Sequence, residues 1–229
     1  AHRDLHSFPT RRSSDLDNAL AFVRIEAARA AVTCRASSPR IESSEFVRNE
    51  KALVVEGAFS RPVVVGNTLH RNTGPAVTAT EGSAPSIENN TVCDNGGAGI
   101  ILESAAADMS GNLIARNRQN GLLVKGSRGF LRGNRLTGNE PWNLFADLRD
   151  EAFDASGNWW GSDDIASALA TVSGRVEISS IARTPDGEGG AKTVNVLPRE
   201  LGGRIDQDAY LLTSRSPYRV TSEDRKSVV

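Results

Sequence analysis

Apolar, turn-forming and polar residues recur along residues 41–146 with a period of 22 to 23 residues. Each unit begins with an apolar residue, any residue and a third position held by Gly, Ser or Asn. A polar residue, usually Asn, follows, and after it come any residue, a second apolar residue, two further residues and a closing Asn. The closing asparagine stands at Asn49, Asn72, Asn95, Asn117 and Asn139. Five residues earlier, the first polar position holds Ser44, Asn67, Asn90, Asn112 and Asn134. This regular spacing identifies the middle of the chain as a repeat.

The apolar positions of each unit, with the apolar run behind them, predict three brief strands separated by turns. The first apolar position holds Ile41, Val64, Ile87, Met109 and Leu131. The second holds Phe46, Leu69, Val92, Ile114 and Leu136. A weaker copy covers residues 22–34, and a degenerate last copy holds Asn158 and Trp160.

A unit of this length is too short for a pair of helices, which needs about 33 residues. One unit cannot bury its apolar face alone, whereas stacked units form a continuous core. Stacking places equivalent residues about 4.8 Å apart, so that equivalent asparagine amides can bond from turn to turn. We therefore predict an all-β parallel β-helix of about six to seven rungs. Its buried ladder is predicted to contain Asn67, Asn72, Asn90, Asn95, Asn112, Asn117, Asn134 and Asn139.

A leucine-rich-repeat horseshoe is the rival fold. It needs one strand and a helical or extended return in each unit, whereas Gly and Asn interrupt each unit of this chain more than once. The β-helix is therefore favoured.

Three segments resemble right-handed parallel β-helix repeat proteins. They are the rungs NNTVCDNGGAGIIL (89–102) and GNLIARNRQNGLLV (111–124) and the GNWWGS element (157–162). The group includes the pectate-lyase-like fold, NosD-like periplasmic proteins, and carbohydrate-binding or sugar-hydrolase repeat domains. The resemblance covers about residues 20–185 and implies a right-handed solenoid, closed by an Asn-Trp-Trp-Gly element, a short helix and a last strand.

The end of such a solenoid must be covered, because it exposes unpaired backbone and apolar side chains. Asp163 or Asp164 can cap the start of a short helix, and Ile165 and Leu169 would present an apolar stripe. Two interpretations stay open for the neighbouring tryptophans: a platform on which sugars stack, or a plug for the end of the tube. These tryptophans are Trp159 and Trp160.

The chain divides into segments on this interpretation. We expect the β-helix at 17–162, its end cap at 163–185 and a linker at 186–203. The motif SPYRVTSE, within 204–223, resembles the first strand of a further, truncated β-helix domain. Residues 1–16 and 224–229 resemble translated sequencing-adapter sequence, so we expect them to carry no fold and the segment between them to be an internal fragment.

The charge balance and the histidines exclude several classes of function. With 27 basic and 28 acidic residues and a formal net charge of -1, the chain gives no electrostatic reason to expect nucleic acid or an anionic membrane as partner. No apolar run reaches the roughly 18 residues of a membrane span. His2 and His6 lie in the adapter-like segment, which leaves His70. It shares its repeat position with Val47, Cys93, Ala115 and Thr137, so a His-rich metal site or a Ser-His-Asp triad is not expected.

The candidate catalytic residues are acids near the last turns, namely Asp147, Asp150 and Asp154. Resemblance to polysaccharide lyases implies carboxylate-bound calcium with an Arg or Lys base, and resemblance to the hydrolases implies a pair of Asp. These acids do not recur at a fixed place in the repeat, so a solvated surface is the competing interpretation. The same holds for the arginines that could bind acidic sugars: Arg71, Arg116, Arg118, Arg128 and Arg132.

Three functions remain open. The favoured one is a non-catalytic β-helix module, structural or carbohydrate-binding, with a polysaccharide as partner and no cofactor or metal. The alternative is a polysaccharide lyase, epimerase or glycoside hydrolase, with calcium as cofactor in the lyase case. The third is a NosD-like accessory protein of metal-centre maturation, for which His70, Met109 and two unpaired cysteines offer poor copper ligation. The resemblance implies an extracellular, cell-surface or periplasmic location.

Overall fold

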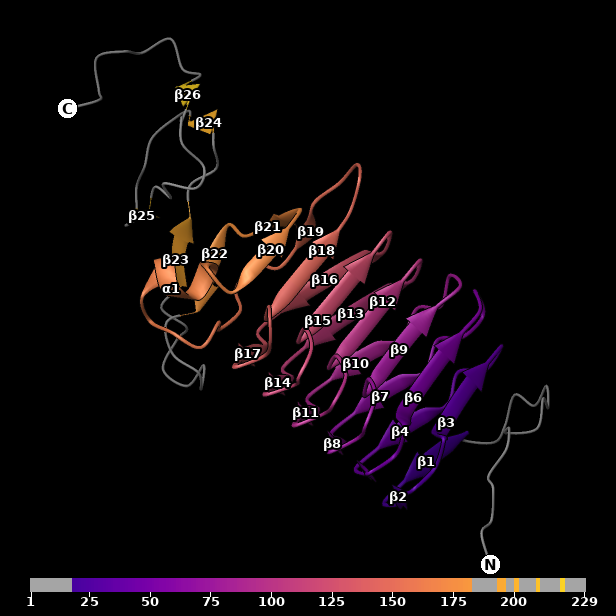
Figure 1. The fold of residues 1–229 in the computed structure, drawn as a ribbon. Helices are drawn as coiled ribbons and strands as arrows, with labels where there is room; N and C mark the ends of the chain where they lie inside the picture. Colours follow the sequence, from indigo (N-terminus) through magenta and orange to yellow (C-terminus); the bar gives the residue numbers. More distant parts are fainter. Residues whose placement is uncertain (1–17, 183–192, 197–199, 202–208, 211–218, 221–229) are drawn as a thin grey trace, which may run out of the picture.

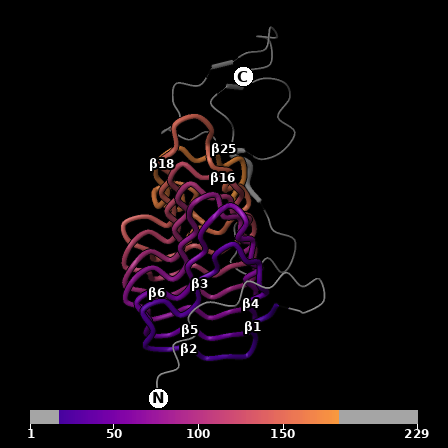
Figure 2. The backbone as a smooth tube through the Cα atoms, turned by 90° about the vertical axis from the view of Figure 1, so that its right-hand side faces the viewer, coloured from indigo at the N-terminus to yellow at the C-terminus, as the bar shows by residue number. Residues whose placement is uncertain are grey.

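In the computed structural model the chain winds into a parallel β-helix of about seven turns (Figure 1). The structure describes residues 18–182, 193–196, 200–201, 209–210 and 219–220. Each full turn contributes one strand to each of three parallel sheets, and Figure 2 shows the turns stacked on one another. The predicted all-β parallel solenoid is therefore confirmed.

The three sheets run along the solenoid. Sheet 1 contains β1 (Ala19–Ala21), β4 (Arg40–Glu42), β7 (Val63–Val65), β10 (Ser86–Glu88), β13 (Ala106–Ser110), β16 (Arg128–Arg132), β19 (Phe153–Asp154) and β21 (Val176–Glu177). Sheet 2 contains β2 (Arg24–Glu26), β5 (Glu45–Val47), β8 (Thr68–His70), β11 (Thr91–Cys93), β14 (Leu113–Ala115) and β17 (Arg135–Thr137). Sheet 3 contains β3 (Ala30–Arg35), β6 (Lys51–Glu56), β9 (Val77–Thr80), β12 (Ile100–Glu103), β15 (Leu122–Lys125), β18 (Leu144–Asp147) and β20 (Val172–Gly174).

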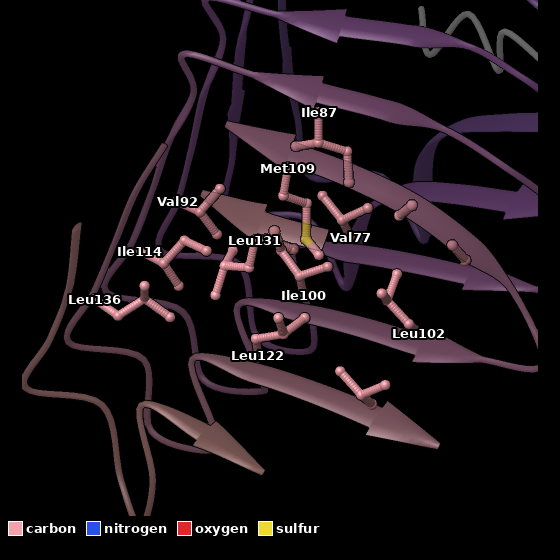
Figure 3. Packing of buried hydrophobic residues seen from close by; sticks show 14 of the residues in the cluster. Val77, Ile87, Val92, Ile100, Leu102, Met109, Ile114, Leu122, Leu131 and Leu136 are labelled. Carbon is pink, nitrogen blue, oxygen red and sulfur yellow. The ribbon is translucent and has the colours of Figure 1, made fainter. Parts of the chain in front are cut away.

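Alternation of side chains along each strand fills the tube. In sheets 1 and 2 the middle residue of each three-residue strand points inward, as Ile87 and Val92 do in Figure 3. Equivalent residues of successive turns pair in register, so that Ile87 lies beside Met109 and Val92 beside Ile114. The aliphatic columns predicted from the repeat therefore form one continuous core.

The corners before and after sheet 2 follow the same pattern: a residue with positive φ is followed by a buried Asn. Before sheet 2, Asn89 (φ 53) precedes Asn90, and after it Asp94 (φ 56) precedes Asn95. Asn and Gly tolerate this left-handed backbone, which explains their frequency before sheet 2, whereas the corner after sheet 2 also holds Arg48, Arg71 and Arg116 with positive φ. The corners place the asparagine side chains inside the tube, where they form the two ladders described below.

The helix α1 (Ile165–Leu169) lies in the connection before β20, near the C-terminal end of the solenoid. Asp164 is its N-cap and accepts a hydrogen bond of 2.8 Å from the Ser167 backbone N–H. Ile165 and Ala168 are buried against the core, with Leu169 packed beside them. The predicted short helix is therefore present, with five residues. Among the described residues, no helix is long and apolar enough to cross a bilayer.

Strands also continue past residue 162, the expected end of the β-helix. β21 pairs with β19, and β20 pairs with β18, so both add to the solenoid sheets within the segment predicted as end cap. β22 (Ser180–Ala182) pairs with β23 (Thr193–Val196), which pairs with β25 (Ala209–Tyr210), and β24 (Glu200–Leu201) pairs with β26 (Arg219–Val220).

Several predicted segments fall largely or wholly beyond the part of the chain that the structure describes. The adapter-like segments, residues 1–16 and 224–229, lie outside the described residues. Most of the predicted linker at 186–203 and of the predicted further domain at 204–223 lie outside them too. Their assignment remains a prediction from the sequence.

Candidate functional site

An open groove of about 680 Å³ lies at the corner between sheets 1 and 2, near the N-terminal end of the solenoid. Its lining combines one aromatic ring with hydroxyl, carboxylate and guanidinium groups. The lining residues are Phe22, Val23, Arg24, Ser43, Ser44, Glu45, Gly66 and Thr68.

The strands of sheet 2 place the polar groups of the groove in one row. Arg24, Glu45 and Thr68 are the first residues of β2, β5 and β8, and they pair in register. Inward-pointing Ile25, buried Phe46 and buried Leu69 follow them, so the row points outward. Neighbouring members stand about 4.8 Å apart, the spacing of strands in a sheet.

Phe22 supplies the aromatic face. It occupies the turn after β1 with φ 55, and its side chain is 83% exposed. The equivalent positions of the following turns hold Ser43, Gly66, Asn89, Gly111 and Gly133. The equivalent residues share the positive φ, so this conformation belongs to the turn, and Phe22 differs from them in its aromatic side chain.

A network of ion pairs surrounds the row. Arg24 Nη1 donates to Glu45 Oε2, and Arg24 Nη2 donates to Glu26 Oε2 at 3.0 Å. Arg48 Nη2 also reaches Glu26, at 2.7 Å. His70 Nε2 lies 2.8 Å from Glu45 Oε1. The network fixes the orientation of the polar groups at the groove.

These contacts decide the charge of the carboxylates. Hydrogen bonding to His70, aided by Arg24, lowers the pKa of Glu45. The hydrogen bond from Arg24, together with Arg48, lowers the pKa of Glu26. Both side chains are therefore anionic at neutral pH. A glycosidase acid needs the opposite shift, a raised pKa, and a second carboxylate across the sugar. Among the residues that line this groove, Glu45 is the one acid, so the groove suits binding better than acid–base cleavage.

Of the three predicted catalytic acids, Asp154 has an ion-pair partner. Asp147 lies in register with Lys125, and Asp154 Oδ2 accepts from Arg132 Nη2 at 2.6 Å. Burial favours the neutral form of Asp154, but hydrogen bonds from Arg132 and Ser156 outweigh this and lower its pKa. Asp150 is exposed, and its backbone carbonyl accepts from Arg175 at 2.9 Å. Within the described residues, no group of three or more His, Cys, Asp or Glu is placed to hold a metal ion.

The two tryptophans differ in burial. Trp160 is 2% exposed and belongs to the core cluster with Ile165 and Ala168 of α1. Its ring is therefore packed inside the core, while its role as a plug for the end of the tube remains a prediction. Trp159 is partly exposed, and its stacking role remains a prediction.

The predicted arginines lie on the surface, but not as one open row. Arg116 donates two hydrogen bonds of 2.8 Å to Asp94, and the Arg132 guanidinium lies 5.3 Å from the centre of the Phe130 ring. Arg71, Arg118 and Arg128 are exposed.

The sulfur atoms are internal. Met109 is buried in the core, and Cys34 and Cys93 are buried free thiols. Burial raises the pKa of Cys34 to about 12, and burial together with Asp94 raises that of Cys93 to about 11. Neither thiol is therefore ionised at neutral pH, which does not favour the copper ligation of a NosD-like role.

The groove itself was not among the sites predicted from the sequence. The signal was present at Phe22, because every equivalent position in the next turns holds a small or turn-forming residue. An aromatic side chain at such a position cannot be explained by the needs of the turn.

Comparison with family models matches residues 23–163 to the family described as right handed beta helix region. The match spans more than half of the chain and covers the groove except for Phe22. No curated protein matches the chain. No solved structure matches it either.

Proposed function

The chain belongs to the right-handed β-helix family, and on that premise we propose that it is a non-catalytic module that binds a neutral polysaccharide at the groove beside Phe22. The module belongs to an exported or cell-surface protein, in which the solenoid serves as a rigid support. The resemblance to carbohydrate-binding β-helix repeats supports this location and role.

One observation carries the proposal: an 83% exposed aromatic ring stands at the edge of a groove lined by hydroxyl and charged groups. Binding sites for small ligands combine apolar faces with a few placed polar groups. Sugar rings have the same division, since their C–H faces are apolar and their edges carry hydroxyls. The Phe22 ring matches the face, and Ser43, Glu45 and Thr68 match the edge.

The charges of the groove favour a neutral sugar. Arg24 and Glu45, its charged lining residues, are paired with each other. Because the pair adds no net charge, the groove does not concentrate anions. An acidic polysaccharide would also meet the anionic Glu45, whose pKa is lowered.

The test compares the binding of neutral and acidic polysaccharides to the full chain by isothermal titration calorimetry. Phe22→Ala is expected to weaken binding of the preferred neutral polymer about tenfold or more, as for a central aromatic contact. Phe59→Ala is the matched control, because Phe59 is 81% exposed on the loop between β6 and β7. Equal binding by both variants would contradict the proposal.

The same samples test the enzymatic alternative. Incubation with and without calcium, followed by size analysis of the polysaccharide, detects chain cleavage. Intact polymer is expected in both cases. Reproducible cleavage would replace the binding module by a lyase or hydrolase.

A further inference from the structure

The outer face of sheet 3 carries two columns of outward-pointing residues, in register from turn to turn. The apolar column holds Thr33, Val54, Thr78, Ile101, Leu123 and Phe145. Two residues further along each strand, the charged column holds Arg35, Glu56, Thr80, Glu103, Lys125 and Asp147. Each of β3, β6, β9, β12, β15 and β18 contributes one residue to each column, and β20, the seventh strand of the sheet, continues the apolar column with Ser173.

This face is open in the described part of the chain. Figure 1 shows the six strands side by side, and no described helix or other strand crosses them. Ile101, Leu123 and Phe145 are partly exposed beside the charged column, whereas Val54 is only 8% exposed. Sheets with apolar outer columns pack face to face about 10 Å apart.

The charged column is complementary to the same column read in the opposite direction, because opposite charges then face each other. Read from β3 to β18, the charged column runs positive, negative, neutral, negative, positive, negative. A two-fold axis parallel to the strands, lying between β9 and β12, turns the solenoid direction around but keeps the position along each strand. It therefore sets apolar column against apolar column and charged column against charged column.

The contacts across this axis are complementary at each turn. Arg35 faces Asp147 of the second copy, Glu56 faces Lys125, and the Thr80 hydroxyl faces Glu103. In the apolar column the larger side chains face smaller ones: Phe145 against Thr33, Leu123 against Val54 and Ile101 against Thr78. Every pair occurs twice, as a symmetric interface requires.

Shifting the register by half a step destroys the match. An axis through β12 sets Glu56 against Asp147 and Glu103 against itself. An axis through β9 sets Arg35 against Lys125 and Glu56 against Glu103. Like charges so placed oppose association. A whole-step shift toward β3 joins four strands of each copy instead of six, and a whole-step shift toward β20 sets Glu103 against Lys125 and Thr80 against Asp147 and so keeps the signs.

We propose that the outer face of sheet 3 binds a second copy of this chain, in a face-to-face dimer whose solenoids run in opposite directions. The contact is modest, since six strands span roughly 25–30 Å. A reversible dimer of micromolar strength or weaker follows, because small interfaces are transient. Arg35 already bonds to Glu56 at 2.6 Å, but its side chain stays 74% exposed and available to the partner.

The test is sedimentation equilibrium of the full chain over a range of concentrations. The wild type is expected to dimerise reversibly. Lys125→Glu sets an acid against Glu56 at two symmetric places and is expected to raise the dissociation constant tenfold or more. The double variant Glu56→Lys, Lys125→Glu restores opposite charges and is expected to recover most of the lost affinity.

Arg128→Glu is the control, because it makes the same change of charge at an exposed residue of sheet 1. It is expected to leave the dimer unchanged. Thermal unfolding by circular dichroism shows that each variant is folded. A wild type that stays monomeric at all concentrations overturns the proposal. So does a dimer that Lys125→Glu weakens no more than Arg128→Glu, or one that the double variant fails to restore.

Discussion

At the scale of single residues, the asparagine ladders are set by complete hydrogen bonding. Asn112 Oδ1 accepts from the Asn90 backbone N–H at 2.9 Å and from Asn90 Nδ2 at 3.0 Å. Its own Nδ2 donates to the Ile87 carbonyl and to Asn134 Oδ1, both at 2.8 Å. Only a side-chain amide of this length offers both acceptor and donors. This is why the repeat demands asparagine at a fully buried position.

We expect Asn112→Ala to lower the free energy of unfolding by about 3–5 kcal/mol, because it leaves several buried groups of Asn90 and Ile87 without partners. Ser44→Ala is the control at the start of the same ladder. The Ser44 hydroxyl makes two bonds, to Val23 N–H and the Glu42 carbonyl, so its loss is expected to cost about 1 kcal/mol. Urea unfolding followed by circular dichroism measures both, and equal losses would contradict the ladder's energetic role.

The ion pair of Asp94 makes the stability of the corner after sheet 2 depend on pH. The hydrogen bonds from Arg116 lower the pKa of Asp94. The resulting stability is fully present above the unfolded-state pKa of about 3.9 and is lost as the pH falls through the lower folded-state value. We expect the melting temperature of the wild type to fall more steeply than that of Asp94→Asn between about pH 5 and pH 2. The pair is exposed, so its contribution to the free energy of unfolding is less than about 1 kcal/mol. Parallel pH profiles would show that the pair contributes nothing.

The ladder residues could be predicted from the sequence because their spacing repeats. The hydrogen-bond partner at the C-terminal end of a ladder could not, because it breaks that spacing. Asn143 follows Asn139 by four residues, yet its Oδ1 accepts from Asn139 Nδ2 at 2.9 Å and so replaces the next rung. The ion pairs beside the groove could not be predicted for a similar reason. Glu45 and His70 come 25 residues apart, in different columns of the repeat, and meet only because their side chains lean across neighbouring strands.

At the scale of elements, the three strands of each turn follow directly from the alternation of apolar and polar residues. The last turns were harder to predict, because the insertion of α1 before β20 breaks the period. The sequence offers Asp163 and Asp164 as N-cap of α1, and in the structure Asp164 is the N-cap. Sequence could not decide between them, since either carboxylate stands near the first helical turn.

We expect Asp164→Ala to destabilise the protein by about 1 kcal/mol, because it removes the cap of α1 and leaves the Ser167 N–H without that acceptor. Asp163→Ala is the matched control, since the neighbouring acid is exposed and is not the N-cap. Its effect is expected to stay within about 0.5 kcal/mol. Thermal unfolding measures both. If Asp163→Ala were the more damaging change, the assignment of the cap would be wrong.

At the scale of the whole molecule, each turn pairs with the turns directly before and after it. Stability in such a solenoid is close to a sum over turns and the interfaces between them. The sheets and both ladders repeat with the same step of 22 or 23 residues over most of their length. A complete turn is therefore a removable unit, provided that the cut respects the step.

Deleting residues 90–111 removes one turn of 22 residues and joins Asn89 to Asn112, the next residue of the same ladder. β14, β15 and β16 then take the places of β11, β12 and β13, so we expect a shorter protein that still unfolds cooperatively. Its urea m-value should fall by about one seventh, because the surface exposed on unfolding shrinks by one turn. Deleting residues 90–100 removes about half a turn and sets the strands of one sheet against the corners of another. This control is expected to lose the β-sheet circular dichroism signal, and two deletions of equal stability would contradict the modular packing of the solenoid.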